Sequence, residues 1–148
     1  MPSCRICNEE KSDADTRTNP IINPAIEDPE QLLTYSFLRI KPLAGSGQEQ
    51  KAQQTIDVCN LNCERLYSAR SALMKSITEY IDELKDKINW ISEADTDQKR
   101  KIRITKLKNS LAVIDSLTTA ESAFSGYAKW FIQQCPEYQK AKQIVASR

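Results

Sequence analysis

The chain has 148 residues, a length that suits one domain or a small knob attached to a longer helical element. Charged residues make up 28% of it, as expected for long exposed helices, and the formal net charge is +1. It contains no histidine, which removes the commonest general base, the Ser–His and Cys–His nucleophile pairs and every mixed Cys/His metal site. We therefore expect a protein that is not an enzyme and has no small-molecule substrate.

The sequence also predicts a compartment. No stretch approaches the roughly 18 to 20 apolar residues of a membrane span, and the residues after Met1 are polar, unlike a secretory signal. We expect a cytoplasmic protein without membrane contact. In a reducing compartment, paired cysteines bind metal more often than they form disulfides.

The first 47 residues predict a cysteine turn, a polar segment and one short helix. Asn19-Pro20 and Asn23-Pro24 are turn or extended signals. Asp28 suits an N-cap and Pro29 the first helical position, so a helix is expected from Pro29 to about Ile40. Pro42 and the Gly45–Gly47 turn would end it.

Residues 48–148 predict two long helices and a short C-terminal one. Between about Gln50 and Ile91 there is neither glycine nor proline, and apolar positions recur every three or four residues, which predicts a single helix. Residues 92–97 break it, with Thr96 or Asp97 as the next cap. A second helix is expected from about Gln98 toward Gln134, and a short one from Glu137 to about Ala146.

The predicted fold is therefore all-α, a long antiparallel, coiled-coil-like helical hairpin. Acidic residues at the end of the first arm and basic residues at the start of the second should lie side by side. The short helices should cover the open end of the hairpin and leave the apolar seam near its tip exposed for a partner.

Four of the five cysteines form two pairs, Cys4/Cys7 and Cys59/Cys63. A C-x-x-C turn can direct two thiolates at one ion, and a C-x-x-x-C on a helix places both thiols on one face. Four thiolates make a closed structural zinc site, which would link the two segments of the chain into one treble-clef-like unit. A disulfide, or burial as small apolar residues, is the alternative for these cysteines, and burial suits Cys135 best.

The second long helix opens with a run of basic residues, which we call the basic run. Phosphate contacts by these side chains would make it a nucleic-acid surface. The alternative is a solvated or salt-bridged helix face, because apolar residues interrupt the run at core spacing. The basic run comprises Lys99, Arg100, Lys101, Arg103, Lys106 and Lys108.

The segments Cys4-Arg-Ile-Cys7-Asn-Glu-Glu-Lys-Ser12 and Thr18-Asn-Pro-Ile-Ile-Asn-Pro24 together resemble the entry to cysteine-bound HNH endonuclease-like domains. The resemblance implies a treble clef in which a later cysteine pair completes the zinc site. In that family a histidine carries metal-dependent cleavage, and Asn19 or Pro20 would occupy its position here. The resemblance thus implies a catalytically dead relative.

The most direct interpretation is a zinc-stabilised helical adaptor or regulator that binds protein along its hairpin, with a protein partner or a homo-oligomer. The alternative is a nucleic-acid-binding protein related to a catalytically dead HNH or treble-clef nuclease, using the basic run.

Overall fold

The structure, a computed structural model, describes residues 18–147, which fall into two compact units, residues 18–70 and 71–147. The described part is mostly helical, which confirms the predicted class at that level, and it also contains a two-stranded sheet. No helix in this part is long and apolar enough to cross a membrane. In chain order, the elements are η1 (Pro29–Gln31), β1 (Leu33–Ser36), β2 (Arg39–Pro42), α2 (Glu49–Val58), α3 (Glu64–Ser92), α4 (Asp97–Ser116), α5 (Ser125–Gln133) and α6 (Pro136–Ala146).

A β-hairpin replaces most of the helix expected over 29–40, so that prediction is wrong. The cap itself is present: the Asp28 carboxylate accepts a hydrogen bond from the Glu30 amide at 3.0 Å, but only one 3-10 turn follows. β1 and β2 then pair antiparallel through a two-residue turn at Phe37 and Leu38. Leu38 is only 2% exposed, so the turn carries an apolar side chain into the interior of this unit.

The helix expected from 50 to 91 is two helices, because residues 59–63 form a turn between α2 and α3. Asn60 adopts a positive φ of 46°, which ends the first helix. Propensity and periodicity alone favoured continuation through this point. Tertiary hydrogen bonds to the turn, described below, outweigh them.

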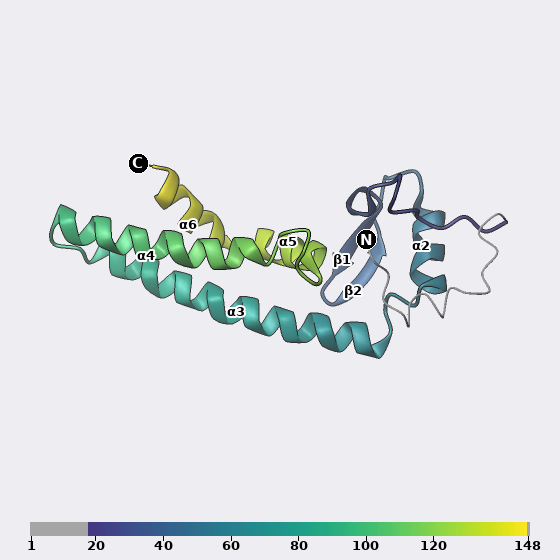
Figure 1. Ribbon diagram of the computed structural model, residues 1–148, viewed down its shortest axis with the longest axis horizontal. Coiled ribbons are helices and arrows are strands. Elements are labelled where there is room, and N and C mark those ends of the chain that lie inside the picture. Colours follow the sequence, from purple (N-terminus) through teal and green to yellow (C-terminus); the bar gives the residue numbers. More distant parts are fainter. Residues whose placement is uncertain (1–17, 148) are drawn as a thin grey trace. The chain divides into compact units, whose positions relative to one another are not determined.

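The second unit is built on an antiparallel hairpin of the 71–92 part of α3 and α4 (Figure 1). The predicted break is confirmed: α3 ends at Ser92, and the Thr96 hydroxyl accepts a hydrogen bond from the Lys99 amide at the start of α4.

The expected second arm also stops early, at Ser116, and α5 begins only at Ser125. Hydroxyl groups hold the intervening bend: the Ser116 and Thr118 hydroxyls donate to the carbonyls of Val113 and Asp115. Serine and threonine side chains that bond nearby backbone compete with helix continuation, which explains the break.

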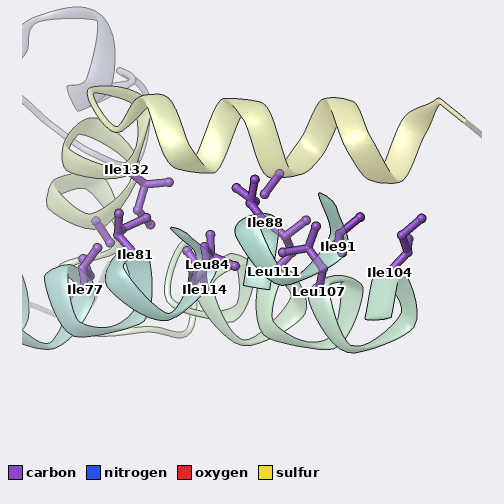
Figure 2. Packing of buried hydrophobic residues seen from close by; sticks show 12 residues of the cluster. Ile77, Ile81, Leu84, Ile88, Ile91, Ile104, Leu107, Leu111, Ile114 and Ile132 are labelled. Atoms are coloured by element: carbon purple, nitrogen blue, oxygen red, sulfur yellow. The ribbon is translucent and has the colours of Figure 1, made fainter. Parts of the chain in front are cut away.

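One apolar core joins the four helices of the second unit, with Ile77 and Leu84 of α3, Leu107 of α4 and Ile132 of α5 almost fully buried. Figure 2 shows α6 lying over the side chains of α3 and α4. The predicted C-terminal helix is thus present, but Ile144 and Val145 of it pack on the core. The apolar seam near the tip is therefore covered by the chain's own α6, and the expectation of an exposed seam is wrong.

Candidate functional sites

The second cysteine pair lies in the turn between α2 and α3, not on one helix. Cys59 is the C-cap of α2, with its amide donating to the Thr55 carbonyl at 3.0 Å. Cys63 directly precedes α3, and its carbonyl accepts from the Tyr67 amide at 2.9 Å. The expected arrangement of the two thiols one turn apart on a helix face is therefore wrong.

Two side chains that the sequence reasoning did not single out as functional hold this turn in place. The Asn62 amide side chain bonds both backbone groups of Ile40: its oxygen accepts from the N–H at 2.8 Å, and its nitrogen donates to the carbonyl at 2.9 Å. The Arg70 guanidinium, 1% exposed, donates two hydrogen bonds of 3.1 and 3.0 Å to the Leu61 carbonyl. The sequence did contain a signal for the role of Arg70, because this arginine occupies a position of the apolar stripe where a buried residue is expected.

Whether the turn belongs to a metal site depends on cysteines outside the described residues. Cys4 and Cys7 lie in the part of the chain that is not described, and Cys59 and Cys63 are both partly exposed. Residues 18–147 contain no group of three or more Cys, Asp or Glu placed to hold a metal ion. Two thiolates are half of the ligands of a structural zinc site, so a complete site would also require the thiolates of Cys4 and Cys7. The four-cysteine zinc site remains a prediction.

The structure divides the basic run among different environments. Lys99 forms an ion pair with Asp95 at 2.9 Å within the chain turn. Arg103 and Lys106 both lie over the Trp90 ring, at 4.5 and 5.0 Å from its centroid, and Arg103 also donates to the Trp90 carbonyl. These two cations are engaged by α3 through cation–π contacts, not through carboxylates.

Arg100 and Lys101 have a different setting, a groove between α4 and α6. The groove has a volume of about 510 Å³, and Lys140 of α6 lines it with them. Ile104 and Ile144 form its apolar part, and Asp97 is its one lining acid. Within the described residues, none of the three cations has an ion pair. Lys108, the last residue of the run, is exposed.

The acidic residues of α3 do not pair with α4, so the expected juxtaposition of the two charge blocks is wrong. The core positions Ile77, Ile81, Leu84, Ile88 and Ile91 define the inward face of α3. At about 100° per residue, the acids fall opposite that face. These exposed acids, together with the exposed Glu93 directly after the end of α3, form what we call the acidic stripe: Glu79, Asp82, Glu83, Asp86 and Glu93.

Only one member of the acidic stripe has an ion pair in the described part of the chain, Glu83 with Lys87 of the same helix at 3.0 Å. The unit thus carries an acidic face on α3 and a basic groove between α4 and α6, and neither is neutralised by the other.

A polar cluster fastens α6 to the end of α4. The Tyr138 hydroxyl and the Lys142 ammonium each donate to the Asp115 carboxylate at 2.6 Å. The hydrogen bond that Lys142 donates to the Asp115 carboxylate raises the pKa of Lys142, and burial together with the same carboxylate raises the pKa of Tyr138. At neutral pH the cluster therefore holds a neutral phenol and a charged ammonium.

No protein-family model matches the chain, and no solved structure matches it. It is similar to the Septu protein PtuB of Bacillus thuringiensis, with 31% identity over 85 residues, which cover 57% of this chain. The matched region is 31% of the length of that relative, so the chain spans less than a third of it.

Proposed function

We propose that this chain is a PtuB-like, non-enzymatic regulator or adaptor whose helical unit, residues 71–147, binds protein. The similarity to the Septu protein PtuB supports a relationship over the matched 57% of the chain. The observation that carries the binding proposal is the pair of unneutralised faces, the acidic stripe of α3 and the groove lined by Arg100, Lys101 and Lys140.

The two signs of charge favour a protein partner over a nucleic acid. A phosphate backbone would be drawn to the groove and repelled by the stripe, whereas a protein surface can complement both. Clustered surface charge of this kind steers association and fixes its orientation more than it adds affinity. The binding surface would therefore be the charged outer face of the unit, because α6 covers the apolar seam.

The proposal keeps zinc as a structural cofactor. Cys4, Cys7, Cys59 and Cys63 would hold the ion, with the first pair brought to the turn between α2 and α3. Because the ion would join two distant segments, its binding free energy would add directly to folding.

Affinity capture of the tagged full chain from cells that express it naturally tests protein binding. We expect a partner that is retained by the natural chain and lost by an Arg100→Glu/Lys101→Glu variant. Arg39→Glu/Lys41→Glu is the matched control, since it changes the net charge equally at two exposed positions of β2. Identical protein profiles for the natural chain and the groove variant would contradict the proposal.

Nucleic-acid binding is the second candidate, favoured by the unpaired cations of the groove together with Lys108. It predicts fluorescence-anisotropy binding of a labelled DNA or RNA duplex that weakens steeply with salt. Lys101→Gln and Lys108→Gln should each reduce the salt slope by about 1. Binding that is absent at low salt would eliminate this candidate.

A further inference from the structure

The acidic stripe and the basic groove of the second unit cannot contact each other within one chain, so each can pair with opposite charge only on another molecule. The stripe begins at Glu79 on α3 and ends at Glu93, directly after the helix; its part on α3, from Glu79 to Asp86, spans about 11 Å at 1.5 Å per residue. It points away from the core that holds α4 and α6, so its carboxylates cannot reach the groove of their own chain.

We propose that the occupant of the α4–α6 groove is the acidic stripe of a second copy of this chain. This inference rests on the proposed protein-binding function and names its partner. The stripe and the groove lie on opposite sides of the unit, so the stripe of one copy would contact the groove of the next in a head-to-tail arrangement.

Charge complementarity carries the choice of occupant. The groove brings Arg100, Lys101 and Lys140 together against one acid, Asp97. The stripe brings four carboxylates with no ion pair in the described part of the chain. When the stripe of one copy faces the groove of another, the repulsion between like charges on each helix is offset by attraction between opposite charges across the contact.

The partly apolar groove adds contact area to the charge pairing. Ile104 and Ile144 line it. Exposed ion pairs alone contribute little, roughly 0 to 1 kcal/mol each, and salt screens them. We therefore expect a self-association that is reversible and weakens as salt rises.

Sedimentation velocity across a range of protein concentrations is the first test. The natural full chain should self-associate in about 0.05 M salt and dissociate at least tenfold more readily in about 0.5 M salt, because the screening length falls severalfold. Arg39→Glu/Lys41→Glu, away from both faces in the sequence, should self-associate like the natural chain. A natural chain that stays monomeric at low salt would overturn the inference.

Charge exchange is the decisive test. A groove variant, Arg100→Glu/Lys101→Glu, and a stripe variant, Asp82→Lys/Asp86→Lys, should each lose self-association, because both faces then carry the same sign. An equimolar mixture of the two should associate again, since each contact between the two variants regains opposite charges. All four positions are exposed, and circular dichroism would verify that both variants fold.

The outcomes separate this inference from the proposed function. A mixture that stays monomeric while each variant is folded would overturn the second-copy occupant. If affinity capture nevertheless retains another protein through the groove, the proposed function stands and the occupant is that protein. Low-salt binding of a DNA duplex by a monomer, lost in the groove variant, would replace a second copy with nucleic acid.

Discussion

At the level of single residues, the structure shows that some polar side chains have a structural role and not a catalytic or ligand-binding one. Arg70 lies on the apolar stripe of α3, yet it is 1% exposed and bonds the carbonyl of the α2–α3 turn. Burying a guanidinium is costly unless it is hydrogen-bonded, and both terminal nitrogens of Arg70 donate to the Leu61 carbonyl, so the turn and Arg70 stabilise each other. The position of both cysteines 59 and 63 follows from this contact and from Asn62.

Phe37 carries backbone strain in the β-hairpin turn. Its φ is 56°, in the left-handed region, and its side chain is 60% exposed. Replacing it with glycine and with alanine deletes the same exposed ring, and only glycine removes the Cβ that disfavours this conformation. We expect Phe37→Gly to be more stable than Phe37→Ala by about 1 kcal/mol in urea unfolding. Equal stabilities would show that the turn is unstrained.

The cysteines give a residue-level test of zinc. Elemental analysis of the full chain purified without chelator should find about one zinc per chain, since four thiolates complete a structural site. Cys59→Ser should lower this content sharply and also lower stability, because metal binding and folding are coupled. Cys135→Ser is the control: burial raises the pKa of that thiol, which disfavours the thiolate that a metal requires. Zinc content unaffected by a Cys59→Ser/Cys63→Ser double change would contradict the site.

At the level of elements, α6 matters most for the second unit. It turns a two-helix hairpin, which buries only a narrow stripe, into a bundle with a continuous core. Its attachment combines Ala141, Ile144 and Val145 on the core with the polar cluster of Asp115, Tyr138 and Lys142. The same helix creates the basic groove by bringing Lys140 beside the start of α4.

The polar cluster predicts an alkaline limit to stability. The pKa of Lys142 is raised above its ordinary 10.5, so its stabilising charge is fully present below that pH and is lost as the pH rises through the raised value. The pKa of Tyr138 is raised above 10.0, so its ionisation in the unfolded chain favours unfolding in the same range. The free energy of unfolding should therefore fall above about pH 10.

Tryptophan fluorescence can measure this loss of stability in the second unit, because Trp90 and Trp130 are the two tryptophans of the chain and both belong to that unit. Asp115→Asn should lower the free energy of unfolding by about 1 kcal/mol at neutral pH, a modest value since the pair is partly exposed. It should also flatten the alkaline decline. A decline of equal steepness in Asp115→Asn would assign the effect to other groups.

At the level of the whole molecule, the described chain consists of two compact units with separate cores. The first contains Ile22, Leu32 and Ala52, and the second contains the larger cluster of α3 to α6. Contacts within the first unit include the 2.9 Å hydrogen bond from the Ile22 amide to the Thr55 hydroxyl.

Leu107 tests the core of the second unit. It is fully buried, so Leu107→Ala should lower the free energy of unfolding by about 3 kcal/mol through lost burial and a residual cavity. Val113→Ala on the same helix is the matched control: Val113 is 47% exposed, and its change should be below about 0.5 kcal/mol. Comparable losses for both variants, measured by urea unfolding, would show that the cluster is not the source of stability.

The sequence by itself determined the helical class, the break at residues 92–97 with its Thr96 cap, and the C-terminal helix, because periodicity and capping are local properties. Tertiary structure alone decided the β-hairpin at 33–42, where burial of Leu38 outweighs a helix-start signal. It also decided the turn at Cys59–Cys63, through Asn62 and Arg70, and the direction of the acidic stripe. A block of like charges in the sequence indicates which charged residues lie on the same helix. Whether they face the neighbouring helix or solvent depends on which face of the helix is buried in the core.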